Sequence, residues 1–430
     1  MTQQDTRSIS PWAWVPSLYL AEGLPYVIVM TVSVIMYKRL GIPNDQIAFY
    51  TSWLYLPWVI KPLWSPLVDL FRTKRYWIVT MQFMIGAALA GVALTIPGPD
   101  FFQYSLAIFW LLAFSSATHD IAADGFYILA LDDNKQATFV GIRSLFYRIS
   151  MVAGQGLLVM LAGNLEVTSI LGLGGSISAA WSITIGIVGI LFLVFAIYHN
   201  TALPSVSSDR ATGVSSTDTL RSFLKTFADF FRRDNIGITL AFLLLYRLGE
   251  AQLVKMISPF MLDNPAKGGL GMTTEQVGLA YGTIGIIALA LGGILGGIAI
   301  ARNGLRSWIW PMALIMHVPD AVFVLLSVYQ PTDMIIVTTA TALEQFGYGF
   351  GFASYLMYMI YVARGIQSTA HYALSTGLMA LGMMLPGMAS GWIQSQIGYT
   401  NFFIWVLIAT IPSFFLARMV RVDPEFGKKK

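Results

Sequence analysis

Two carboxylates and a histidine interrupt an apolar stretch of the sequence. His119, Asp120 and Asp124 follow Phe101–Phe114, a mainly apolar run that is typical of a membrane-embedded helix. An ionisable group near the bilayer centre costs about 2.5–3.5 kcal/mol on insertion scales, so such groups usually face protein or a water-filled cavity. Asp120 and Asp124 are four residues apart and therefore share one helical face. This segment predicts a polar interior and a path for an ion or a substrate.

The composition excludes a soluble globular protein. Of the 430 residues, 56% are hydrophobic and only 11% are charged. The absence of cysteine excludes disulfides and thiolate metal sites. His119, His199, His317 and His371 lie far apart in the sequence, so we expect no metal site and no cofactor. The net charge of +4 comes from loops and the tail, and we expect no nucleic-acid partner.

The elements that position the charged residues are predicted to be membrane-spanning helices. A span needs about 20 apolar residues, and twelve such segments can be placed along the chain. The polar stretch 199–233 reads as a cytoplasmic linker between an N-terminal half, 1–198, and a C-terminal half, 234–430. The predicted spans are 11–36, 47–68, 76–96, 101–131, 139–163, 177–198, 234–262, 274–300, 307–329, 333–361, 369–397 and 400–420.

The distribution of Lys and Arg predicts the orientation. If the N-terminus is cytoplasmic, 18 of the 26 Lys and Arg residues fall in inner segments and 3 in outer loops. Cytoplasmic segments carry the excess of basic residues. We therefore expect both termini to be cytoplasmic.

The two halves resemble each other. Leu18–Glu22 in the first span is similar to Leu245–Glu250 in the seventh, and the basic turn Asp69–Arg75 has a counterpart in Arg302–Arg306. Twelve helices arranged as two parallel six-helix repeats describe the major facilitator architecture. We therefore predict an all-α integral membrane protein with the major facilitator fold.

In two antiparallel helices joined by a turn, residues at equal membrane depth have sequence numbers whose sum is roughly constant. Spans four and five turn near 132–138, and spans one and two turn near 37–46, so each acid in these spans finds a base at its own depth on the next helix. The predicted ion pairs are Asp120 with Arg148, Asp124 with Arg143, and Glu22 with Lys61.

The second half offers no such neighbours. Its eighth span has glycines where a partner would lie, and these glycines are expected to let helices approach closely. Its charges must find partners on non-adjacent helices or water in a cavity. They are Arg247, Glu250, Lys255, His317, Asp320, Glu344 and His371.

Each of these residues has a structural interpretation beside a functional one. Buried ion pairs can merely hold helices in register, a histidine can be a polar packing contact, and most aromatic residues pack or lie at interfaces. The candidates for proton coupling are Asp120, Asp124, Glu22, Glu250, Glu344 and His119. The candidates for substrate binding are Arg148, Arg143, Lys61, Tyr26, Trp58, Tyr147, Arg247, Tyr348 and Tyr355. The candidates for an intracellular gate are Asp69, Arg72, Arg75, Arg302 and Arg306, which also serve as orientation signals.

Four segments resemble the AmpG-type muropeptide permeases, a major facilitator branch related to acetyl-CoA transporters. They are Ala21–Pro25, Lys61–Asp69, Asp120–Asp124 and Tyr147–Met151, and the similarity is densest over residues 15–155. His119 and Glu22 depart from the permease pattern, and Asp124-Gly125 followed by an aromatic residue is closer to the acetyl-CoA branch. The residues that carry over are Gly23, Lys61, Asp69, Asp120, Asp124 and Arg148.

The resemblance implies proton-driven import of anhydro-muropeptides across a bacterial inner membrane for cell-wall recycling. Import of a disaccharide or other oligosaccharide, or transport of acetyl-CoA, stays open at this point. We find no nucleophile elbow and no nucleotide loop, so an enzyme is not expected, and a non-transporting sensor is a weaker alternative. The expected partners are a small-molecule substrate, protons and membrane lipids, and the expected state is a monomer.

Overall fold

A computed structural model describes residues 9–170, 173–207, 209–210, 225, 227–364 and 368–428. Within these ranges the regular structure is helical apart from one hairpin, in which β1 (Ser169–Ile170) pairs antiparallel with β2 (Leu173–Gly174). The α-helices are α1 (Val15–Val27), α2 (Ser33–Arg39), α3 (Asn44–Trp53), α4 (Leu56–Phe71), α5 (Lys74–Thr95), α6 (Phe101–Ala130), α7 (Asp133–Met151), α8 (Val159–Val167), α9 (Ile177–Ala202), α11 (Ile236–Leu245), α12 (Leu248–Leu262), α13 (Thr274–Val277), α14 (Ile286–Asn303), α15 (Leu305–His317), α16 (Ala321–Tyr329), α17 (Met334–Ala363), α18 (Ser368–Ala409) and α19 (Ile411–Met419).

Nine helices among the described residues are long and apolar enough to cross a membrane. Each coincides with a predicted span, and the last, Ala370–Met419, covers two of them and is interrupted at Gly398, where φ is 75°. The remaining two predicted spans are occupied by α3 with α4 and by α17. The number of twelve spans and the cytoplasmic termini remain predictions.

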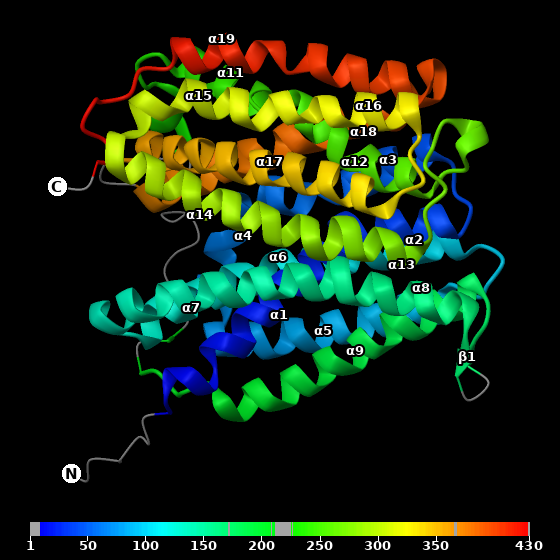
Figure 1. The fold of residues 1–430 in the computed structure, drawn as a ribbon. Helices are drawn as coiled ribbons and strands as arrows, with labels where there is room; N and C mark the ends of the chain where they lie inside the picture. Colours follow the sequence, from blue (N-terminus) through cyan, green and yellow to red (C-terminus); the bar gives the residue numbers. More distant parts are fainter. Residues whose placement is uncertain are drawn as a thin grey trace. The chain divides into compact units, whose positions relative to one another are not determined.

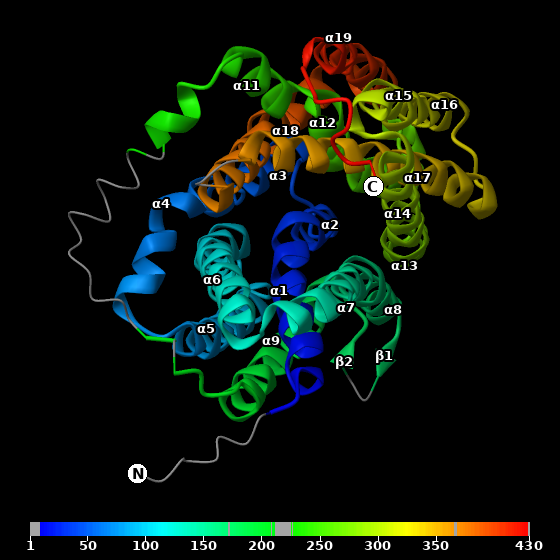
Figure 2. The same ribbon diagram turned by 90° about the vertical axis from the view of Figure 1, so that its left-hand side faces the viewer.

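The chain forms two compact units, which are described separately. The first unit comprises Met1–Val29, Leu63–Gly154 and Leu165–Ser216. In it α1 packs against α6 and α7, while α5 packs against α6 and α9 (Figures 1 and 2). Trp14, which directly precedes α1, and Tyr19 of α1 meet Phe126 and Tyr127 of α6 in its buried apolar core.

The second unit comprises Met30–Pro62, Gln155–Asn164 and Thr217–Lys430. Here α17 lies beside α14 and α15, and α18 packs against α3 and α12 (Figure 2). Its core contains a group of aromatic rings in which Tyr246 stacks on Tyr355 and Phe242 contacts Tyr355. This unit therefore contains the C-terminal half of the chain together with parts of the first, second and fifth predicted spans.

Glycines bring α14 and α17 into close contact. A Cβ atom at Gly292 would lie 2.1 Å from the carbonyl oxygen of Phe346, and one at Gly296 would lie 2.5 Å from that of Phe350. No side chain fits in so little space, so the two backbones touch. The close helix approach that was predicted from these glycines is confirmed.

Several spans are irregular at mid-length. Three contain π-helical segments, Ile28–Val32, Val152–Leu158 and Gly278–Gly285. The seventh predicted span is broken between α11 and α12, and the ninth contains the 3-10 turn Val318–Asp320. Broken helices free backbone groups at membrane depth, which transporters use near their binding sites.

Candidate functional site

Three carboxylates of the first unit lie together. Glu22 comes from α1, and Asp120 and Asp124 come from successive turns of α6. One oxygen of each lies within 4.8 Å of the other two, and the side chains of Glu22 and Asp120 hydrogen-bond each other. A carboxyl group donates a hydrogen bond only when it is protonated. This carboxylate cluster is therefore suited to holding a proton.

Asp124 forms the ion pair that was predicted from depth. The Arg143 guanidinium lies 2.7 Å from Asp124 Oδ1, and Tyr19 donates a hydrogen bond of 3.2 Å to the same oxygen. The guanidinium also lies over the rings of Tyr19, at 4.5 Å, and Tyr127, at 5.1 Å. The Asp124–Arg143 pairing is confirmed, and two aromatic faces hold the arginine in place.

Replacing Arg143 with alanine is expected to lower uptake about tenfold or more, a difference of about 1.4 kcal/mol. Asp124 would lose an ion pair of 2.7 Å while two further carboxylates stay beside it. The uptake rate of Arg143→Lys should lie between those of the alanine variant and the unsubstituted protein. Lysine keeps the charge but has no planar guanidinium group to stack on two rings. Initial uptake rates per folded transporter in proteoliposomes measure the effect.

The matched control for this prediction is Lys135→Ala on the same helix. Lys135 pairs with Asp132 at 3.1 Å, and both side chains are more than half exposed, so the pair contributes little. The backbone N–H of Lys135 and then its side chain lower the pKa of Asp132, and the first of these contacts survives the substitution. Normal uptake by Arg143→Ala would contradict the assigned role.

The predicted ion pair of Asp120 with Arg148 is not formed. Arg148 makes no hydrogen bond or ion pair within the part of the chain that the structure describes. A helix turns about 100° per residue, so Arg143 and Arg148 point about 140° apart and cannot both face α6. Asp120 meets Glu22 of α1 instead.

The other substrate-binding candidates of the first half are divided between the units. Tyr147 of α7 lies near Tyr26 and Glu22 of the first span. Trp58 and Lys61 are half-buried and belong to the second unit. The pairing of Glu22 with Lys61 joins residues of different units, so it remains a prediction.

A buried amide joins two histidines that are 80 residues apart in the sequence. The Gln82 amide nitrogen lies 2.9 Å from His119 Nε2, and its oxygen lies 2.9 Å from His199 Nδ1. Ser17 Oγ lies 2.9 Å from the other ring nitrogen of His199. His119 is thus a member of a polar network that ends next to Asp120, which sequence spacing alone did not reveal.

The second unit contains its own carboxylate cluster. Glu250 of α12, Asp320 of the 3-10 turn and Glu344 of α17 each place one oxygen within 4.8 Å of the other two. All three side chains are at most 1% exposed. These acids thus come from non-adjacent helices but meet one another, so the prediction that each charge finds a partner or water is not confirmed for them. Asp320 was not among the proton-coupling candidates.

Aromatic residues surround the buried arginine of the second unit. Arg247 donates a hydrogen bond to the Tyr348 hydroxyl, and its guanidinium lies 4.7 Å from the centre of the Phe352 ring. Tyr355 is fully buried, and its hydroxyl donates a 2.5 Å hydrogen bond to the Leu243 carbonyl. Arg247 and Tyr348 remain candidates for substrate binding, whereas the position of Tyr355 indicates a packing role.

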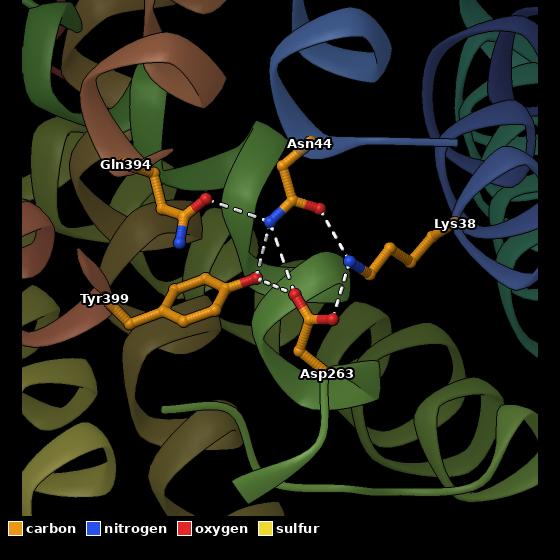
Figure 3. Close-up of polar contacts among 5 residues, drawn as sticks. All are labelled: Lys38, Asn44, Asp263, Gln394 and Tyr399. Carbon is orange, nitrogen blue, oxygen red and sulfur yellow. Dashed lines mark hydrogen bonds and ion pairs between the residues drawn. The ribbon is translucent and has the colours of Figure 1, made fainter. Parts of the chain in front are cut away.

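A polar cluster joins residues of α2, α3 and α18 with the residue that follows α12 in the second unit (Figure 3). Lys38 Nζ lies 2.7 Å from Asp263 Oδ1 and donates a 2.7 Å hydrogen bond to Asn44 Oδ1. Tyr399 donates a 2.6 Å hydrogen bond to Asp263, and the Asn44 amide donates to Gln394 at 2.9 Å. This set is called the Lys38 cluster. It ties α2 and α3 to the end of α12 and to α18 beside the interruption at Gly398.

Close backbone packing continues from the Lys38 cluster along α3 and α18. A Cβ atom at Gly391 would lie 2.2 Å from the Asn44 carbonyl oxygen, and one at Gly387 would lie 2.8 Å from Ser52 Oγ. Lys255 of α12 donates a 3.0 Å hydrogen bond to Thr51 of α3. The second predicted span is therefore tightly closed against the seventh and eleventh at this end.

The predicted gate residues lie in two basic turns. Arg75 donates hydrogen bonds to the Asn200 carbonyl, at 2.5 Å, and to Ser205 Oγ, at 3.0 Å. Asp209 accepts hydrogen bonds from the backbone N–H groups of Lys74 and Arg75, at 2.7 and 3.1 Å. These contacts attach the segment after α9 to the start of α5.

The remaining gate candidates make fewer contacts. Arg72 lies over the Tyr76 ring at 5.4 Å, and Arg302 and Arg306 are exposed. The side chain of Asp69 lies outside the described residues. The gating role of these residues remains a prediction.

Comparison with known proteins places the chain in a family. The sequence profile of the BT1 family matches residues 21–339. The chain belongs to the BT1 family. The predicted resemblance to AmpG-type permeases is confirmed by relatives that carry this name.

Two relatives and one structure illustrate where this BT1-family member stands. It is 26% identical to "Putative transporter AmpG 4" of Rickettsia conorii, over 93% of this chain and 94% of the relative. It is 25% identical to "Anhydromuropeptide permease" of Escherichia coli (strain K12), over 96% and 80%. The structure titled "Crystal structure of D-xylose-proton symporter" matches with a TM-score of 0.73 at 11% identity, covering 97% and 99% of the two chains.

These findings confirm the predicted fold and class. The BT1-family chain is a multi-pass membrane protein with the major facilitator fold, and it is a secondary transporter of small molecules rather than an enzyme. The sequence analysis recognised Asp320 and His317 as intramembrane groups but assigned them no role, and it missed the Lys38 cluster. The similarity between the two halves of the sequence could have predicted the second carboxylate cluster. Glu250 lies 228 residues after Glu22 and Glu344 lies 224 residues after Asp120, so the acids occupy similar positions in the two halves.

Proposed function

We propose that this transporter imports anhydro-muropeptides or related amino-sugar compounds together with protons, across a bacterial inner membrane. The observation that carries the proposal is the cluster of Glu22, Asp120 and Asp124 beside Arg143. Three carboxylates in such proximity do not ionise independently, and they share a site with a cation that attracts anionic groups. The relatives named as anhydromuropeptide permeases support the substrate class.

Alternating access supplies the physical mechanism. Proton binding to Glu22 or Asp120 removes a negative charge beside Asp124. This weakens the electrostatic attraction between Arg143 and the carboxylate cluster. Arg143 then becomes available to a carboxylate of the substrate. Coupling follows because only a broken or weakened Asp124–Arg143 pair accommodates both ligands.

The Lys38 cluster and the glycine contacts of α3 with α18 form the second element of the mechanism. With cytoplasmic termini, as the distribution of basic residues predicts, this cluster lies at the periplasmic end of the second unit. Its closure prevents access from that side. Uptake requires that the ion pair of Lys38 with Asp263 opens once in every cycle.

An imposed pH gradient tests the coupling. Proteoliposomes with an acidic exterior are expected to accumulate labelled N-acetylglucosaminyl anhydro-muropeptide, and a protonophore should abolish this accumulation. Empty liposomes and the Arg143→Ala variant provide the baselines. Uptake that is indifferent to the gradient would refute proton coupling.

A substrate panel tests the chemical class. The muropeptide is expected to compete with its own uptake, whereas a neutral disaccharide and acetyl-CoA should compete weakly. Arg143→Ala should reduce muropeptide uptake more than uptake of the same disaccharide without its peptide. Preferred transport of the neutral disaccharide would instead identify an oligosaccharide importer.

A further inference from the structure

The buried carboxylate cluster of the second unit has more acceptor atoms than donors. Both oxygens of Glu250, both of Asp320 and Oε1 of Glu344 are buried without a hydrogen-bond partner among the described residues. The remaining oxygen, Glu344 Oε2, accepts a 3.0 Å hydrogen bond from Gln345. Five buried and unpartnered oxygens would be strongly unfavourable unless a ligand occupies the space between them.

His317 adds a sixth acceptor from outside the cluster. Its Nε2 lies 3.0 Å from the Tyr246 carbonyl oxygen, which only accepts hydrogen bonds, so Nε2 carries the ring proton. In the neutral ring, Nδ1 then presents a lone pair. Nδ1 is buried without a hydrogen-bond partner and lies 3.6 Å from Asp320 Oδ2. Two lone pairs that face each other need a proton or a cation between them.

The charges facing the cluster can be counted. Arg247 interacts electrostatically with Glu250 and offsets one carboxylate. One proton on either His317 or Asp320, whose nearest atoms lie 3.6 Å apart, would offset the second. Tyr281 and Gln345 face Glu344 and are uncharged. One negative charge remains, which matches a monovalent cation.

The spacing of the ligand atoms fits an ion rather than a further proton. A proton bridges two atoms, whereas here one oxygen from each of three side chains lies within 4.8 Å of the others. Oxygens that are at most 4.8 Å apart leave room for one ion at about 2.4 Å from each, the distance seen for hard cations of calcium's size, which sodium closely matches. The smaller magnesium ion demands tighter octahedral geometry.

We propose that Glu250, Asp320 and Glu344 form a binding site for one sodium ion within the second unit. Glu250 lies in the first turn of α12, directly after the break that follows α11, and Asp320 lies in a 3-10 turn. Such interruptions are where transporters coordinate ions. Sodium binding is a property distinct from proton coupling at Glu22 and Asp120.

Direct binding of sodium to the purified full-length protein tests the site. Equilibrium binding of ²²Na⁺ in detergent, with choline replacing sodium, is expected to saturate at about one ion per chain. Asp320→Asn and Glu344→Gln should each weaken binding by at least about 10- to 100-fold, the loss that follows when a residue supporting a metal ligand is removed. Sodium should also raise the melting temperature of the unsubstituted protein by mass action and should do so less in either variant.

Glu275→Gln is the matched control, because Glu275 is an exposed acid of the same unit. It should bind sodium as the unsubstituted protein does. Absence of saturable binding to the unsubstituted protein would overturn the proposal and identify a cluster that holds only protons. Equal binding by Asp320→Asn and Glu344→Gln would overturn it as well. No substrate or pH gradient is used, so failure here is distinguishable from failure of proton-coupled uptake.

Discussion

Gly391→Val is expected to abolish most transport while leaving the chain folded. A Cβ atom at this position of α18 would lie 2.2 Å from the Asn44 carbonyl oxygen and 2.8 Å from Ala48 Cβ. Valine therefore prevents α18 from closing on α3. Overpacking of this kind costs about 1–3 kcal/mol, which shifts a closed-to-open equilibrium by about 5- to 150-fold.

Two measurements follow this shift. Uptake into proteoliposomes should fall, and a thiol introduced by Ser52→Cys should react faster with a hydrophilic reagent. Ser52 is fully buried in the α3–α18 contact, and the chain has no cysteine of its own that would react. An increase in the labelling rate by a factor of the predicted size would identify opening rather than unfolding.

Gly297→Val is the matched control for this prediction. The same substitution on α14 introduces a side chain where no atom lies within 4 Å of the new Cβ. It should leave both uptake and labelling near their original values. Normal transport by Gly391→Val would show that closure of α18 on α3 is not part of the cycle.

Asp120→Asn is expected to abolish accumulation driven by a pH gradient and to preserve exchange of labelled for unlabelled substrate. The amide imitates a protonated carboxyl group that cannot release its proton, and it can still hydrogen-bond Glu22. Exchange needs only loaded transporters that change conformation. Net uptake needs the proton to leave before the empty transporter returns.

Asp100→Asn is the control, since Asp100 is exposed at the start of α6 and its side chain makes no capping hydrogen bond. It should retain both activities. Loss of exchange together with uptake in Asp120→Asn would instead indicate that Asp120 binds substrate or maintains the fold. Glu22→Gln should resemble Asp120→Asn, because the two groups share one hydrogen bond.

The sequence predicted the helices because their apolar runs are long and their charges are rare. Membrane depth also predicted the Asp124–Arg143 pair, because two antiparallel helices joined by a short turn fix which of their residues lie at the same depth. Depth does not determine which way a side chain points around the helix axis. For that reason Asp120 meets Glu22 on α1, and Arg148 stays apart from it.

Contacts between distant helices were out of reach for sequence reasoning. Asn44 and Tyr399 of the Lys38 cluster are 355 residues apart and hydrogen-bond at 2.9 Å. Neither residue type is unusual at a helix end, so nothing in the sequence distinguishes them. Asp320 was recognised as an intramembrane charge, but its partners depend on how the 3-10 turn after α15 redirects the chain.

The π-helical segments have a mechanical consequence. The boundaries of the two compact units at Val29–Met30 and Gly154–Gln155 fall inside the π-helical stretches Ile28–Val32 and Val152–Leu158. A π turn holds one residue more than an α turn and interrupts the regular hydrogen-bond ladder, so a rod bends there at lower cost than elsewhere. The first and fifth spans are therefore expected to bend at these segments, while the helix on each side of the bend keeps its own side-chain contacts.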